Sequence, residues 1–151
     1  MHYFIIQIEN TPINDCLLLN EDILFEDYKI VNNLGFIDYV YDIQSEDEQN
    51  EKKQDAKAIL KDIFNEDMTL KDIKPFIEEW KNNTLKVLSN TEDKNTPYKA
   101  KYTLEHTHLD TDLLIYHRGL ICTIGDFIDT IYNFYEQGHQ FYMGNAVGYH
   151  F

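Results

Sequence analysis

The densest run of residues that could do chemistry is EHTHLD over residues 105–110. On a strand, side chains two residues apart project from the same face, so His106 and His108 could together bind a divalent metal. Asp110 could add a carboxylate oxygen, and a bound metal would activate water for hydrolysis. These residues make a metal-dependent hydrolase one alternative function for the chain.

The same run resembles part of the His-x-His-x-Asp-His signature of metallo-β-lactamase-like hydrolases, over residues 106–110 only. Thr111 stands where the signature has its next histidine, and His117 or His139 would have to complete the site. The run also lacks the paired His-x-Thr motifs of two-histidine phosphoesterases. We therefore assign neither family, and we expect no metal and no other cofactor.

The two cysteines, Cys16 and Cys122, form no metal-binding or CxxC spacing, and we expect both to be reduced. Cys122 precedes a predicted helix, whose dipole could activate the thiol as a nucleophile. It also ends an apolar run, however, where a buried and unreactive thiol is the commoner outcome. No cationic start or apolar stretch indicates a signal peptide or membrane span, so we expect a cytoplasmic protein.

Charge is distributed unevenly along the 151 residues, whose net charge is −14. Residues 1–50 contain 11 acids and one base, Lys29, which gives −10, whereas residues 51–100 contain 10 of each sign. The remaining residues contribute −4. Because like charges repel, this composition argues against direct binding of nucleic acid or of an anionic membrane.

Hydrophobic periodicity predicts one α+β domain over residues 1–151, with a mostly antiparallel sheet and about four helices packed on it. The predicted strands cover residues 2–9, 36–43, 98–108, a segment through residue 116, and an extended tail over 139–151. The predicted helices cover 21–33 after an Asn20 cap, 45–64 after a Ser45 capping box, about 72–88, and 124–137 after a Thr123 cap, with Gly138 as its C′ residue. The first half of the second helix is wholly polar, and we expect it to project into water.

The predicted helix and strand of the N-terminal third place acids on what could be one surface. Glu21, Asp22, Glu26 and Asp27 belong to the helix, and Asp38 and Asp42 share a face of the strand. Such a surface creates a negative field that steers a basic partner and raises its association rate. We expect these six residues to bind the partner.

The leading hypothesis is therefore a binding protein rather than an enzyme. It would inhibit a basic, nucleic-acid-handling protein such as a nuclease or toxin by covering its cationic cleft. In size and charge the chain is similar to immunity proteins and to anti-defence DNA mimics, although no motif matches either group.

The C-terminal segment suggests a third alternative, a structural subunit of a larger assembly. Residues 132–151 contain seven aromatic side chains. They could pack in the core and on the sheet, or they could form an anchor patch for a neighbouring subunit.

Overall fold

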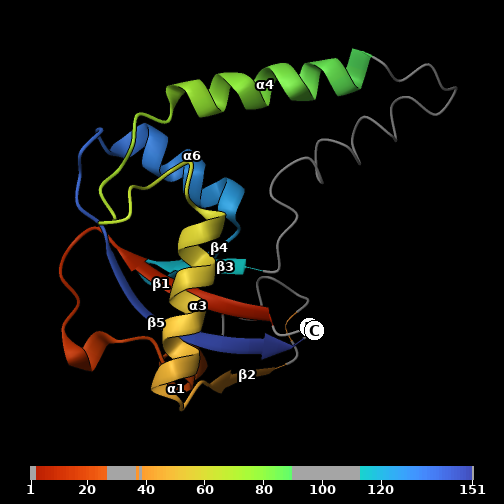
Figure 1. The fold of residues 1–151 in the computed structure, drawn as a ribbon. Coiled ribbons are helices and arrows are strands. Elements are labelled where there is room, and N and C mark those ends of the chain that lie inside the picture. The colour runs from red at the N-terminus through yellow and green to blue at the C-terminus, as the bar shows by residue number, and fades with distance from the viewer. Residues whose placement is uncertain (1–2, 27–36, 38, 90–112, 151) are drawn as a thin grey trace, which may run out of the picture.

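The computed structural model describes residues 3–26, 37, 39–89 and 113–150, except for the side chains of residues 25, 26, 87 and 88. Within these residues the chain forms a five-stranded sheet and four α-helices (Figure 1). The elements in chain order are β1 (Tyr3–Glu9), the 3-10 helix η1 (Asp15–Leu17), α1 (Glu21–Glu26), β2 (Tyr39–Asp42), α3 (Glu46–Ile59), α4 (Lys74–Ser89), β3 (Leu113–His117), β4 (Leu120–Cys122), α6 (Ile124–Phe134) and β5 (Tyr142–His150).

The strand order in the sheet is β2-β5-β1-β3-β4. Only the β1–β3 pair is parallel among the described strands, and the other three pairs are antiparallel. The C-terminal strand β5 lies between β2 and β1, inside the sheet (Figure 1). The predicted α+β class and mostly antiparallel sheet are confirmed, as is an extended C-terminal segment.

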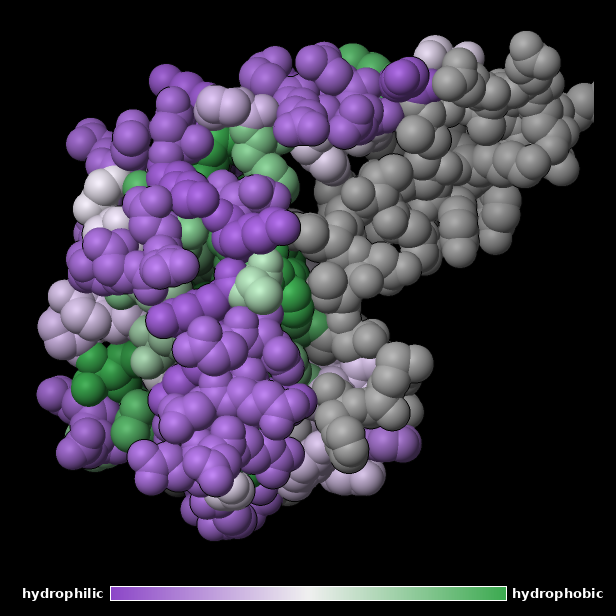
Figure 2. All heavy atoms as spheres, viewed as in Figure 1, coloured by the Kyte–Doolittle hydropathy of each residue, from purple (hydrophilic) through white to green (hydrophobic). Residues whose placement is uncertain are grey.

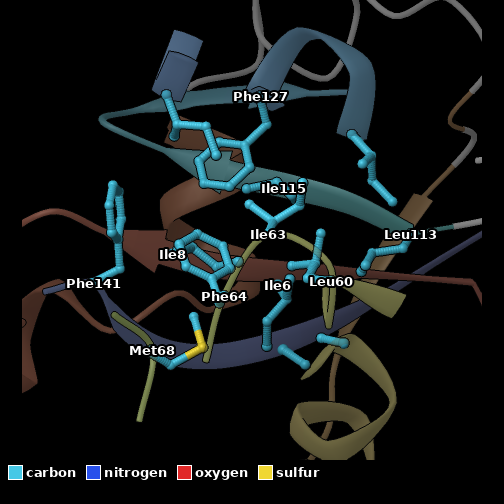
Figure 3. Packing of buried hydrophobic residues seen from close by; sticks show 14 of the residues in the cluster. Ile6, Ile8, Leu60, Ile63, Phe64, Met68, Leu113, Ile115, Phe127 and Phe141 are labelled. Atoms are coloured by element: carbon cyan, nitrogen blue, oxygen red, sulfur yellow. The ribbon is translucent and has the colours of Figure 1, made fainter. Parts of the chain in front are cut away.

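Helices α3 and α6 cover one face of the sheet, where the larger hydrophobic cluster lies (Figure 3). Alternate residues of β1 point into this cluster, as their spacing predicts, because side chains of a strand alternate between its two faces. The second half of α3 and the segment after it add the cluster's other side. The central members are Phe4, Ile6, Ile8, Ala56, Leu60, Ile63, Phe64, Leu113, Ile115, Phe127, Ile131 and Phe141.

The opposite face packs against α1 and the segment that leads to it, through Leu19 and Leu24. The buried amide of Gln7 connects these layers. It donates to the Leu17 carbonyl and accepts from the Leu19 amide, both at 2.9 Å. Gly144 leaves the space that Gln7 occupies, because a Cβ at that position would overlap the Gln7 side chain.

The hairpin between β3 and β4 was not predicted. Arg118 and Gly119 have positive φ angles of 51° and 79°, as in the two-residue turns that connect antiparallel strands. The apolar run over residues 113–122 is therefore two paired strands. The Arg-Gly dipeptide was the sequence signal for this turn, since glycine adopts positive φ without strain.

Two predicted helix ends are wrong. Helix α3 ends at Ile59, and Phe64 instead pairs with Leu70 in an isolated bridge, so a loop rather than a helix buries it. Helix α6 ends at Phe134, and Gly138, with φ of 87°, lies in a later turn, where its amide donates to the Leu70 carbonyl at 2.8 Å. Apolar spacing alone did not distinguish a buried loop from another helical turn.

Helix α4 starts at Lys74, close to the predicted start near residue 72. Phe76 and Ile77 in its first turns pack against the larger cluster. In Figure 1 the helix runs along the top of the molecule, above α6 and far from β2. The predicted strand over 98–108 and residues 27–33 of the first predicted helix lie outside the described residues.

Candidate functional site

The first helix begins where the sequence predicts. The Asn20 side chain accepts a hydrogen bond from the Ile23 amide at 2.9 Å, as an N-cap does. Glu21 and Asp22 follow in the first turn of α1. Their carboxylates interact favourably there with the exposed amides and the positive end of the helix dipole, by about 0.3–1 kcal/mol each.

Strand β2 brings Asp42 to the same place. Its Oδ1 accepts a hydrogen bond from the Glu21 amide at 2.7 Å. Asp42 is two residues after Val40 and shares its face of β2, and Val40 is buried in the cluster beneath α1, so both face that helix. The structure thus brings together Glu21, Asp22 and Asp42, which lie on two separate elements of the sequence.

The other three predicted partner-binding residues cannot be placed in the same way. The backbone of Glu26 ends α1, but its side chain lies outside the described residues. Asp27 and Asp38 lie outside them entirely. Their membership of the surface stays a prediction.

The N-terminus of α3 adds three more acids close to Asp42. Ser45 caps the helix by accepting a hydrogen bond from the Glu48 amide at 3.4 Å, which confirms the predicted cap. Glu46, Asp47 and Glu48 form its first turn and are exposed. They start four residues after Asp42 along the chain, a distance of at most about 14 Å even when fully extended.

Gln49 fixes this first turn to the sheet. Its amide nitrogen donates to the carbonyls of Ala146 at 2.8 Å and Ile43 at 3.1 Å, and its oxygen accepts from the Ala146 amide at 2.8 Å. The side chain therefore occupies both hydrogen-bonding groups of one β5 residue, as another residue of β2 would. The expectation that the first half of α3 projects into water holds for its exposed acids, but it is wrong for Gln49, which bonds to the sheet.

Lys52 supports the same correction. Its side chain is only 13% exposed and lies over the Phe4 ring, with 5.4 Å from Nζ to the ring centroid. The Asp55 carboxylate lies 3.8 Å from Nζ. A lysine stem covers apolar surface while its amine remains near water, so a polar sequence can still form a packed helix face.

We call Glu21, Asp22, Asp42, Glu46, Asp47 and Glu48 the acidic edge, because they surround the edge strand β2. The described residues up to Glu51 contain no lysine or arginine, and Lys29 lies outside them. Two helix N-termini, those of α1 and α3, compensate part of this charge locally. A backbone amide thus holds the Asp42 carboxylate, and the Asn20 and Ser45 caps hold the helix starts that carry the other five acids.

The histidines proposed as metal ligands do not form a described site. His106, His108 and Asp110 lie outside the described residues. In the part of the chain that the structure describes, no three metal-ligating side chains converge. The hydrolase alternative gains no support from the structure.

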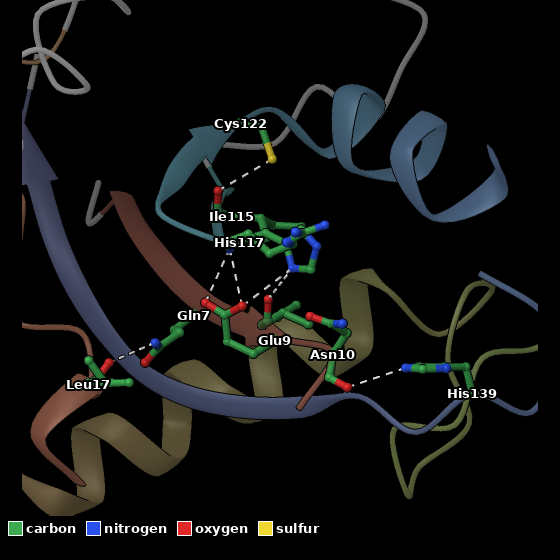
Figure 4. Close-up of polar contacts among 10 residues, drawn as sticks. Gln7, Glu9, Asn10, Leu17, Ile115, His117, Cys122 and His139 are labelled. Atoms are coloured by element: carbon green, nitrogen blue, oxygen red, sulfur yellow. Dashed lines mark hydrogen bonds and ion pairs between the residues drawn. The ribbon is translucent and has the colours of Figure 1, made fainter. Parts of the chain in front are cut away.

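His117 and His139 instead belong to a group of buried and partly buried rings, which we call the aromatic–histidine cluster and which comprises His117, Phe127, Tyr135, His139 and Phe141. Nδ1 of His117 lies 2.7 Å from the Ile8 carbonyl oxygen, so it carries the proton and donates (Figure 4). Nε2 of His139 lies 3.3 Å from the Asn10 carbonyl oxygen. Both imidazoles thus contact the end of β1 or the residue after it.

Cys122 is not an activated nucleophile. Burial raises the pKa of its thiol to about 12, and the Asp126 carboxylate adds to the rise. Its Sγ donates to the Ile115 carbonyl at 3.5 Å. Cys16 is exposed, and both cysteines are free, as expected.

Some of the C-terminal aromatic side chains pack in the core, and others are exposed as an anchor patch would be. Phe141 and Tyr149 are buried in the two clusters, whereas Tyr132 and Phe134 of α6 are 44% and 79% exposed. Phe151 lies outside the described residues. Core packing therefore accounts for only part of this aromatic segment.

Comparisons with known proteins add no functional assignment. No protein-family model, no curated protein and no solved structure matches the chain. Among the described residues, no helix has both the length and the apolar character that a membrane crossing requires.

Proposed function

We propose that this protein is an acidic binding protein whose acidic edge covers a basic surface of a protein partner. The observation that supports the proposal is that the acidic starts of α1 and α3 are both anchored beside the edge strand β2, α1 by the Asp42–Glu21 hydrogen bond and α3 by the Gln49–Ala146 hydrogen bonds. Glu26, Asp27 and Asp38 belong to the same surface in this proposal.

Closely spaced acids on anchored helix starts suit rapid recognition of a basic partner. Charges of one sign that lie within a Debye length, ~8 Å at physiological ionic strength, act together on an approaching cation. Such a field steers association and mainly changes the on-rate. Because hydrogen bonds already hold the helix starts, little backbone ordering remains to oppose binding.

The edge strand also carries an aromatic side chain that could anchor a partner. Tyr39 is 53% exposed, and its ring stacks on His150 with 5.2 Å between centroids and 9° between planes. Tyrosines that are already held in place are frequent hot spots in protein interfaces. Tyr39 and Asp42 lie on opposite faces of β2, so a partner that wraps this edge would contact both.

The partner class follows from the charge. Proteins that handle nucleic acids present lysines and arginines in positions that match phosphates. A row of carboxylates can occupy the same positions and exclude the nucleic acid by steric and electrostatic occlusion. The protein would then act as an inhibitor, with no turnover and no cofactor.

Two matched variants test the proposal. The edge variant carries Asp22→Asn, Asp42→Asn, Asp47→Asn and Glu48→Gln, and the asparagine at position 42 retains an acceptor oxygen for the Glu21 amide. The control variant carries Glu66→Gln, Glu78→Gln, Asp129→Asn and Glu136→Gln at exposed positions elsewhere. Both variants lose four negative charges, so they differ only in where the charge was.

The measurement is capture from the cells that naturally make the protein, identification by mass spectrometry, and association kinetics with the captured partner. We expect a basic partner whose association slows at least tenfold with the edge variant and much less with the control. Equal slowing by both variants, or unchanged binding by the edge variant, would contradict the proposal.

A further inference from the structure

A groove of about 450 Å³ runs between the first half of α4 and the segment that connects it to α3. Two aromatic side chains of α4, Phe76 and Trp80, line it. Three carboxylates line it as well, from Asp62, Asp72 and Glu79. In the view of Figure 2 the outer surface of α4 is hydrophilic, and apolar surface is exposed beneath it.

The helix itself places aromatic and acidic groups together. Phe76 and Trp80 are four residues apart and therefore neighbours on one side of α4. Glu79 precedes Trp80 and is exposed, and it lies on the groove side of the helix. Glu78 is also exposed but is not among the described residues that line the groove, and it instead pairs with Lys81 at 3.6 Å.

The described lining has unbalanced charge. Lys71 is its one described base, and Nζ of that lysine donates to the Lys61 carbonyl at 2.6 Å. Asp72 accepts a hydrogen bond from the Lys74 amide at 3.2 Å, which leaves its negative charge in place. Three carboxylates thus face one amine that already has a backbone partner.

We propose that this groove binds an arginine side chain of a peptide segment. A guanidinium stacks on aromatic faces, and its planar set of donors matches carboxylates. Glu79 and Asp62 would pair with the donors while Trp80 and Phe76 contact the flat face. This site is separate from the acidic edge, because α4 and β2 lie at opposite ends of the molecule (Figure 1).

The chain contains one tryptophan, so Trp80 fluorescence reports on the groove directly. The probe is a blocked Gly-Arg-Gly-Arg-Gly peptide, titrated against the full chain. The matched peptide contains citrulline, which keeps the shape of arginine without its charge. We expect the arginine peptide to change the Trp80 emission and the citrulline peptide to have no effect at the same concentrations.

The variants locate the binding. Asp62→Asn with Glu79→Gln should weaken peptide affinity about fivefold or more, because each exposed ion pair contributes up to about a fivefold factor. Glu78→Gln should bind like the unmodified protein. The edge variant described above should also bind normally, so this site and the proposed function can fail independently.

Four outcomes would overturn the proposal. Equal binding of the citrulline peptide would mean that charge is not recognised. Equal weakening by Glu78→Gln, or loss of binding in the edge variant, would place the peptide elsewhere. Binding of free arginine as tight as that of the peptide would mean that the ligand is the amino acid and not a peptide segment.

Discussion

In both the acidic edge and the aromatic–histidine cluster, polar side chains form hydrogen bonds to backbone groups. The carboxylates of the edge are largely in contact with water, whereas His117 of the cluster is buried. At the edge, Asp42 and Gln49 bond to helix and strand amides while the neighbouring carboxylates remain exposed. In the cluster, His117 is 6% exposed, and its Nε2 has no hydrogen-bond partner among the described residues.

This difference separates two uses of a polar side chain. An exposed carboxylate keeps its hydration, so several of them can lie on the acidic edge without a large decrease in the free energy of unfolding. A buried polar atom costs free energy unless it is bonded, so His117 acts mainly through its effect on stability. We therefore expect substitutions in the cluster to change folding, and substitutions of the edge carboxylates to change binding.

The largest effect should come from the cluster itself. Phe127 is fully buried and contacts the rings of Phe64, His117 and Phe141. Phe127→Ala should lower the free energy of unfolding by about 3–5 kcal/mol, because it removes buried surface and leaves a cavity. Chemical denaturation measures this loss. Phe134→Ala is the control, since Phe134 is largely exposed, and a comparable loss there would contradict the division between core and surface.

The next largest loss of stability should come from Gln49, which connects the acidic edge to strand β5. Gln49→Ala removes three hydrogen bonds, two to Ala146 of β5 and one to Ile43 directly after β2, and should destabilise the protein by about 1–3 kcal/mol. Hydrogen exchange should become faster at Ala146 and at the start of α3. Gln54→Ala, at an exposed position of the same helix, should change neither. If exchange at Ala146 is unaffected, Gln49 does not hold the acidic edge in place.

A smaller decrease in the free energy of unfolding is expected for a substitution of His117. His117→Phe keeps a ring of similar size but removes the donor to the Ile8 carbonyl. It also removes the buried Nε2, which partly offsets the loss, so we expect about 1 kcal/mol by denaturation. Partner association should be unchanged. A slower association in a fully folded variant would show that the cluster and the edge are not separate in function.

The smallest effect at neutral pH is expected for Cys122. Because its pKa is raised to about 12, the folded protein retains the thiol proton after the unfolded chain has lost it, above about pH 9. The free energy of unfolding should therefore fall between about pH 9 and 12, and this fall should be less steep in Cys122→Ala. Iodoacetamide should modify the exposed Cys16 first at pH 8. Modification of Cys122 at the same rate would contradict its burial.

The sequence predicted those parts of the site whose signals are local. The Asn20, Ser45 and Thr123 caps are each confirmed by a side-chain hydrogen bond within three residues. The alternation of Phe4, Ile6 and Ile8 correctly predicted one buried face. Caps and alternation depend on neighbouring residues and the periodicity of one element, so a single segment contains the information.

Other features depend on contacts between distant segments. Gln49 is 97 residues from Ala146, and nothing in a polar helix indicates that one glutamine bonds to a strand. The histidines His117 and His139 resemble possible ligands in sequence, but the fold places them among rings contributed by α6 and by the segment between α6 and β5. The aromatic tail divides into core and surface for the same reason.

The amino-acid sequence by itself determined the α+β class, the helix starts and the concentration of acids in the first 50 residues, because propensity, capping and charge are properties of local sequence. Only the tertiary structure decided that Asp42 lies against Glu21 and that the first turn of α3 stays beside β2. Those positions depend on which strands pair, and strand pairing is set by the burial of two clusters that draw on residues from both ends of the chain.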